Sequence, residues 1–231
     1  DITRNIKTEG TFPVAGQIGL FAGGQEPSNV NTVDQITVAT TGNATDYGDL
    51  IQAQDGRSAG IGSFVRGIHG GGRTPTKLNV IQYTQFSTTG NFADFGDLTA
   101  ARDQLSSHSN NVRGVFAGGL APGKSNIIDY ITIASVGNAT DFGDLTVASY
   151  SGGGTGNSTR AILQTSGLYP SSTANNVDFV EIASTGNAGD FGDLSSARYL
   201  SAGMSTSTRG FFGAGYHYPA GASAVVDEMN I

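Results

Sequence analysis

The 231-residue chain contains no cysteine and no tryptophan. Without cysteine, neither a disulfide framework nor a thiolate metal site can form. Basic residues are also few: lysine and arginine number 12 against 19 acidic residues, and the formal net charge is −7. A chain with no basic stripe has little means of neutralising phosphates, so the composition argues against nucleic-acid binding.

Long hydrophobic runs are missing as well. No apolar stretch approaches the roughly 18 residues that a membrane-spanning helix needs. No signal peptide is visible in the chain either. We therefore expect no membrane insertion.

What the chain does contain is a repeated phrase. The nine residues Gly-Asn-Ala-Thr-Asp-Tyr-Gly-Asp-Leu begin at Gly42, and close variants begin at Gly90, Gly137 and Gly186, at spacings of 48, 47 and 49 residues. A period of this length with a glycine pair in each copy is typical of β-propeller blades.

Each repeat contains four short segments, which we name by their order. The innermost segments, rich in small residues, are 57–64, 106–111, 150–155 and 199–207. The Gly-rich segments are 19–24, 66–72, 113–119, 160–166 and 209–215. The alternating segments are 33–38, 81–86, 128–133, 177–182 and 226–231, and the outermost segment is the repeated phrase itself. Their period-two alternation predicts strands, and no helical period is sustained.

These segments predict a single all-β domain, a five-bladed β-propeller of four-stranded antiparallel blades. The expected blades are residues 6–52, 53–100, 101–147, 148–196 and 197–231 plus 1–5. Residues 1–5 are expected to complete the fifth blade, because Asp1-Ile2-Thr3 resembles Asp97-Leu98-Thr99. Closure would remove exposed sheet edges. A fragment of a longer array is the alternative.

Two features of the repeat suit this architecture. The innermost segments carry glycine, alanine and serine, which fit where strands from all blades crowd around one axis. Each phrase carries one aromatic residue, which we expect to pack between neighbouring blades: Tyr47, Phe95, Phe142 or Phe191. Truncating such a buried ring should cost about 3 to 5 kcal/mol.

The pattern resembles kelch repeats, in which a strand ending in Gly-Gly precedes an alternating strand, a turn and an aromatic-bearing strand. The chain departs from that pattern by using phenylalanine or tyrosine instead of tryptophan, and by having Thr165-Ser166 in place of the fourth Gly-Gly. Residues 113–146 are similar to degenerate kelch-like repeats of marine bacteriophage virion and tail-fibre proteins. This resemblance implies a propeller fold in a virion, although one fold hosts many functions.

Several motifs look chemical but recur with the structural period. Asp-Phe-Gly at 94–96, 141–143 and 190–192 repeats in register with the blades and has no kinase catalytic loop upstream. Asn43, Asn138 and Asn157 begin formal glycosylation motifs. The first two fall where a turn is expected, and asparagine favours turns.

Ionisable residues do not predict a catalytic or metal site. The phrase aspartates are too few for a calcium loop, and we expect one of them to cap the turn and the other to pair with an arginine, as Asp97 with Arg102 or Asp193 with Arg198. The histidines, His69, His108 and His217, fall in different blades. We therefore expect no enzyme activity, catalytic residue, metal or cofactor.

The repeats differ most between the Gly-rich and alternating segments. These loops are residues 25–32, 73–80, 120–127, 167–176 and 216–225, and each contains one proline. They are expected on the same face as the loops that lead to the next innermost strand. Rigid, divergent loops on a uniform scaffold usually carry binding residues, and aromatic faces with polar tips suit sugar rings or protein epitopes. The predicted ligand-binding residues are Tyr169, Tyr216, His217 and Tyr218.

Together these features predict a non-enzymatic virion module, either a phage tail-fibre or a capsid-associated protein. It would bind a host-surface glycan or another virion protein, within the virion or outside the cell, as part of a larger assembly. The alternative is a secreted bacterial propeller that binds or cleaves carbohydrate. Cleavage would need two carboxylates about 5 to 10 Å apart.

Overall fold

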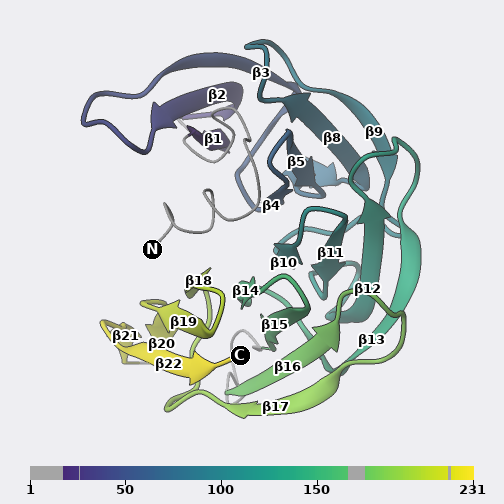
Figure 1. The fold of residues 1–231 in the computed structure, drawn as a ribbon, viewed down its shortest axis with the longest axis vertical. Coiled ribbons are helices and arrows are strands. Elements are labelled where there is room, and N and C mark those ends of the chain that lie inside the picture. The colour runs from purple at the N-terminus through teal and green to yellow at the C-terminus, as the bar shows by residue number, and fades with distance from the viewer. Residues whose placement is uncertain (1–17, 26, 166–174, 218–219) are drawn as a thin grey trace.

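The computed structural model describes residues 18–25, 27–165, 175–217 and 220–231 (Figure 1). These segments form antiparallel β-strands and no helix, which confirms the all-β prediction. Accordingly, none of them contains a helix long and apolar enough to cross a membrane.

Five sheets of three or four strands follow one another along the chain. The first contains β1 (Ile18–Gln25), β2 (Asn29–Thr37) and β3 (Thr45–Gln54). The second contains β4 (Ala59–Gly62), β5 (Arg66–Gly70), β8 (Val80–Gln85) and β9 (Ala93–Asp97). The third contains β10 (Ser106–Ser109), β11 (Arg113–Ala117), β12 (Ser125–Thr132) and β13 (Thr140–Ser149).

The fourth sheet contains β14 (Gly154–Gly156), β15 (Arg160–Gln164), β16 (Asn176–Glu181) and β17 (Gly189–Asp193). The fifth contains β18 (Ala202–Ser205), β19 (Arg209–Gly213) and β22 (Val226–Asn230). Two small hairpins lie in the divergent loops: β6 (Arg73–Thr74) pairs with β7 (Thr76–Lys77), and β20 (Tyr216–His217) pairs with β21 (Gly221–Ala222).

The four predicted segments form a four-stranded meander in the second, third and fourth sheets. All four innermost strands, β4, β10, β14 and β18, are shorter than the predicted segments. Before three of them the backbone turns through a left-handed residue, at Gln104, Ser151 and Leu200. The strand that residues 1–5 were expected to add to the fifth sheet lies outside the described residues.

The sheets are arranged around an arc, with β4, β10, β14 and β18 on its inner side (Figure 1). Neighbouring inner strands approach closely. A Cβ built on Gly154 would lie 2.0 Å from the Ser107 carbonyl oxygen, and one on Gly203 would lie 2.1 Å from the Gly154 carbonyl oxygen. This crowding explains the small residues, as the sequence predicted.

The repeated phrase holds neighbouring sheets together. The Gly137 N–H donates to the Phe95 carbonyl at 2.7 Å, and the Asp97 N–H donates to the Asn138 side-chain oxygen at 3.0 Å. A Cβ on Gly96, whose φ is 142°, would lie 2.5 Å from the Gly137 carbonyl. Each copy of the phrase therefore binds the next copy. The prediction from sequence gave the asparagine only a role in a turn, but its side chain also accepts a hydrogen bond from the preceding sheet. The equivalent asparagines are Asn91 and Asn187.

The phrase aromatics are buried as predicted in three of four copies. Tyr47, Phe95 and Phe142 are each 3 % exposed. Phe142 packs with Val180 and Ile182 of the next sheet, so it bridges two sheets. Phe191 in the last copy is only half-buried.

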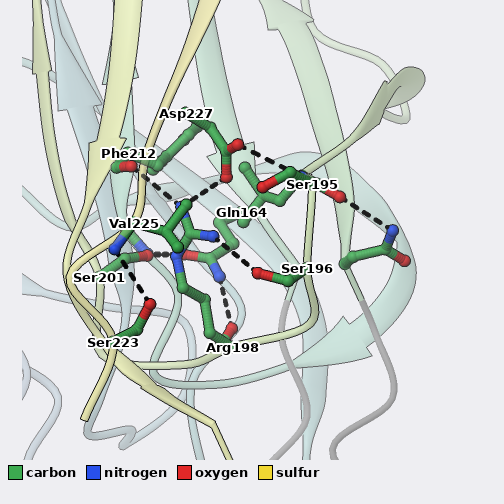
Figure 2. A network of polar contacts seen from close by, with 12 residues as sticks. Gln164, Ser195, Ser196, Arg198, Ser201, Phe212, Ser223, Val225 and Asp227 are labelled. Atoms are coloured by element: carbon green, nitrogen blue, oxygen red, sulfur yellow. Dashed lines mark hydrogen bonds and ion pairs between the residues drawn. The ribbon is translucent and has the colours of Figure 1, made fainter.

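The predicted ion pairs within the phrase region are wrong. Arg102 pairs with Asp129 and not with Asp97, at 2.6 Å, and both side chains are fully buried. Arg198 likewise pairs with Asp227, at 2.6 Å. The reason is that each arginine points across the junction to the alternating strand of the next sheet, as Figure 2 shows for Arg198.

The two ends of the arc expose residues that are buried elsewhere. Val226 of the fifth sheet is 61 % exposed, whereas Ile128 and Val177 at the same repeat position are 0 % and 1 % exposed. Phe21 of the first sheet is 60 % exposed, and its equivalent Phe116 is 0 % exposed. Among the described residues, the first and fifth sheets thus each have a neighbouring sheet on one side only.

Candidate functional site

A depression of about 700 Å³ lies at one end of the inner strands. Its lining comes from the segments that lead into β4, β10, β14 and β18, so four successive repeats meet there. The side chains that line it include Arg57, Gln104, Tyr150, Tyr199 and Leu200.

A series of backbone hydrogen bonds holds this lining in place. The Gln104 N–H donates to the Arg57 carbonyl at 2.6 Å, the Ser151 N–H to Gln104 at 2.9 Å, and the Leu200 N–H to Ser151 at 2.8 Å. These bonds join one repeat to the next around the depression. They make a rigid rim from segments that are more than 40 residues apart in sequence.

The same rim residues adopt a left-handed backbone. Gly56 has a φ of 76°, and Gln104, Ser151 and Leu200 have φ values of 59°, 60° and 58°. Three non-glycine residues in this conformation store strain, which persists only where the surroundings fix the backbone. Leu200 is also 61 % exposed, so a large apolar side chain is held out toward solvent at the rim.

Three tyrosines gather beside this rim. The Tyr199 and Tyr216 ring centroids are 5.4 Å apart with planes inclined at 50°. Burial, with the neighbouring phenol of Tyr216, raises the pKa of Tyr199; burial and Tyr199 likewise raise the pKa of Tyr150. Tyr150 and Tyr199 therefore present neutral phenols, able to donate and accept hydrogen bonds, at physiological pH.

The predicted site residues are placed only in part. Tyr216 is 37 % exposed, and its backbone bonds reciprocally to Tyr199, at 2.8 and 3.2 Å. This contact confirms that the divergent loops share a face with the segments leading to the inner strands. Tyr169 and Tyr218 lie outside the described residues.

His217 has a structural role in its hairpin. Its Nε2 atom lies 3.1 Å from the Ser223 hydroxyl and 3.5 Å from the Ser196 hydroxyl. These contacts tie the β20–β21 hairpin to the segment before Arg198. The same segment contains Tyr199, so the contact of His217 with Ser196 helps to hold the segment that carries this tyrosine.

Sequence reasoning missed Tyr150 and Tyr199 because both stand at the edge of segments that read as small-residue strands. A signal was present. The two tyrosines are 49 residues apart at one repeat position, where the first two repeats have Asp55 and Asp103. A change from aspartate to tyrosine in successive copies marks a surface that differs between repeats.

Ser58, His69 and Gln54 form a polar chain that opens into the depression. The Gln54 Nε2 atom lies 3.2 Å from His69 Nδ1, and His69 Nε2 lies 2.6 Å from the Ser58 hydroxyl. These two contacts occupy both nitrogens of the His69 ring, and either tautomer of the ring fits them.

Cations stand beside the aromatic rings. The Lys124 ammonium lies 6.0 Å from the Tyr150 ring centroid, and Arg57 is paired with Asp55 at 3.3 Å in an exposed position. Within the described part of the chain, no three histidine or acidic residues are grouped to hold a metal ion. The site therefore offers neutral phenols, an apolar rim residue and positive charge.

No protein-family model matches this sequence, and no curated protein is similar to it.

Proposed function

We propose that the chain is a non-enzymatic binding module whose tyrosine-bearing face contacts a host-surface glycan or a partner virion protein. The observation that carries this proposal is the convergence of Tyr150, Tyr199 and Tyr216 on a rim with a fixed backbone. Aromatic faces with polar edges suit sugar rings and protein epitopes. A rigid rim lowers the entropy lost when a ligand binds.

The same proposal includes a closed, five-bladed propeller as the scaffold. Three successive junctions repeat the same contacts, and Val226 and Phe21 at the two ends expose positions that are buried inside the array. Residues 1–5 are proposed to add the missing outer strand of the fifth sheet. Ile2 would then take the place of Leu98, which is 3 % exposed.

The virion setting comes from the resemblance to kelch-like phage repeats. In that setting the module would belong to a tail fibre or to the capsid surface, in the virion or outside the cell. Its partners would be other virion proteins or a host glycan, and its net charge of −7 disfavours nucleic acid.

A secreted bacterial carbohydrate-active propeller is the second reading. Hydrolysis of a glycosidic bond uses two carboxylates facing one pocket. The described lining of the depression supplies phenols, hydroxyls and a guanidinium instead. That chemistry favours binding over cleavage.

A glycan array probed with the full chain tests the proposal. We expect binding to fall at least tenfold, about 1.4 kcal/mol, in Tyr199→Ala and Tyr216→Ala. Val136→Ala, at a residue 57 % exposed in a turn after β12, serves as the control and should bind normally. Undiminished binding by both tyrosine variants would exclude this face as the glycan site.

A further inference from the structure

The charge of this chain is unevenly distributed. The five divergent loops contain three basic residues, Arg73, Lys77 and Lys124, and one acidic residue, Glu26. In the whole chain, by contrast, acidic residues outnumber basic ones 19 to 12. The loops on the tyrosine-bearing face are therefore positive in a protein whose net charge is −7.

Most of the other described basic side chains are occupied by partners within the protein. Two arginines are buried in ion pairs with aspartates, two donate to main-chain carbonyls of the next repeat, and two pair with glutamates. In that order they are Arg102 and Arg198, Arg66 and Arg113, and Arg160 and Arg209. None of these six guanidinium groups belongs to the described lining of the depression. The cations that a ligand in the depression can meet are therefore others.

Arg57 is the one charged residue in the described lining. Its side chain is 50 % exposed, and its Nε atom lies 3.3 Å from a carboxylate oxygen of Asp55. Among the described residues, no partner takes the two terminal nitrogens of this guanidinium. Those nitrogens form a planar fork that matches the two oxygens of a carboxylate. Arg57 can therefore hold a carboxylate while it stays paired with Asp55.

A second cation stands at the edge of the depression. The Lys124 ammonium lies 6.0 Å from the centroid of the Tyr150 ring, which is part of the lining, and the lysine side chain is exposed. A sugar ring placed against Tyr150 would therefore lie close to a positive charge. An ammonium at this distance attracts anionic substituents of such a ring.

The acidic residues next to this lining are each matched by a cation. Asp55 is paired with Arg57, and Asp103, which is fully buried, lies 3.8 Å from the Lys77 ammonium. No aspartate or glutamate belongs to the described lining itself. Lys124 forms no ion pair with a described residue. An anion that enters the depression therefore meets an excess of positive charge from the described residues.

We propose that the depression selects an acidic sugar, whose carboxylate binds the terminal nitrogens of Arg57 and whose ring lies against Tyr150 or Tyr199. This inference rests on the proposed glycan-binding function and adds the class of glycan. Gln104 supplies a neutral donor between these groups, because its side-chain oxygen already accepts from the Ser151 hydroxyl and leaves its amide nitrogen for the ligand. The volume of about 700 Å³ lies within the roughly 300 to 1,000 Å³ of small-ligand sites.

A glycan array that pairs each acidic sugar with its uncharged form tests this inference. Oligouronates and sialylated oligosaccharides are printed beside their methyl esters, which keep the sugar and remove the charge, and sulfated glycans form a third set. We expect the full chain to bind a carboxylated glycan about tenfold or more tightly than its methyl ester. Added sodium chloride should reduce this preference, because salt screens charges that are partly exposed.

Arg57→Gln locates the preference in the depression. We expect it to weaken binding of the acidic glycan about tenfold and to leave binding of the methyl ester unchanged, because it removes only the charged fork. Arg209→Gln is the matched control. Arg209 is 58 % exposed and pairs with Glu228 at 3.0 Å, but it begins β19, at the end of the strand opposite to the divergent loop. Arg209→Gln should bind like the wild type.

The outcomes separate this inference from the proposed function. Glycan binding that is lost in Tyr199→Ala but unchanged in Arg57→Gln would leave the proposed function standing and overturn the choice of an acidic sugar. Equal binding of acid and methyl ester, or tighter binding of sulfated than of carboxylated glycans, would overturn it as well. Absence of all glycan binding would contradict both the glycan-binding function and this inference.

Discussion

His69 shows how one residue can change a junction without changing the fold. It occupies the repeat position that Phe116 and Phe212 hold in other sheets, and all three side chains are buried. Burial lowers the pKa of His69 from 6.5 to about 4. Its neutral ring is held between Gln54 and Ser58, so polar contacts replace hydrophobic packing at this position.

This pKa predicts an acid-dependent loss of stability. The unfolded chain binds a proton at His69 near pH 6.5, but the folded chain does not until about pH 4. The part of the free energy of unfolding that depends on neutral His69 is therefore fully present above pH 6.5. It falls by about 3 kcal/mol in all as the pH is lowered to 4. Urea unfolding of the wild type and of His69→Phe across this range measures it. The prediction fails if both proteins lose stability in parallel.

The carboxylates of the alternating strands show a second residue-scale effect. Asp227 is partly buried, which would raise its pKa, but hydrogen bonds from Ser195 and Arg198 and the charge of Arg198 lower it overall. Burial raises the pKa of Asp178, although Thr146 donates to it. Arg198 crosses the junction to Asp227, whereas no arginine pairs with Asp178 among the described ion pairs. The pKa values of these two aspartates, which hold the same repeat position, therefore shift in opposite directions.

At the scale of elements, the unit of stability is the junction between two sheets. The repeated phrase of one repeat forms hydrogen bonds to the outer strand of the repeat before it. The aromatic ring of that outer strand packs at the same junction, as Phe142 does with Val180 and Ile182. The side chain of Asn138 completes this contact at one junction, and those of Asn91 and Asn187 do so at two others. A glycine is required at Gly96 because the next sheet leaves no room for a side chain.

Two glycines with nearly equal backbone geometry test that requirement. Gly96 and Gly192 have φ values of 142° and 139°, but only Gly96 faces a neighbouring backbone, at 2.5 Å. Gly96→Ala should therefore be less stable than Gly192→Ala by about 1 to 3 kcal/mol, the usual cost of overpacking. Thermal and urea unfolding of the two variants give the difference. Equal losses would mean that backbone strain alone requires the glycine.

At the scale of the whole molecule, five sheets form an arc, and each end of the arc lacks a contact that the inner sheets make. The fifth sheet lacks an outer strand among the described residues, and the first exposes Phe21 at a position that is buried elsewhere. If residues 1–5 complete the fifth sheet, Ile2 becomes a core residue. Exposed sheet edges would then be removed.

Ile2→Ala tests this closure. A buried isoleucine truncated to alanine costs about 2 to 5 kcal/mol. Ile51→Ala is the control, because Ile51 is 49 % exposed on β3, and surface changes usually stay within about 0.5 kcal/mol. Urea denaturation of both variants decides the matter. An Ile2→Ala protein as stable as Ile51→Ala would show that the opening residues do not complete the fifth sheet.

The sequence by itself determined the strands, their order within each sheet and the burial of Tyr47, Phe95 and Phe142. These features depend on period-two alternation within each segment and on a pattern that recurs every 47 to 49 residues, and both can be read directly from the sequence. The tertiary structure alone decided which side chains meet at each junction, because the repeat spacing does not tell toward which neighbouring strand a side chain points. It replaced the predicted Asp97–Arg102 pair by Asp129–Arg102 and brought Tyr199 to Tyr216.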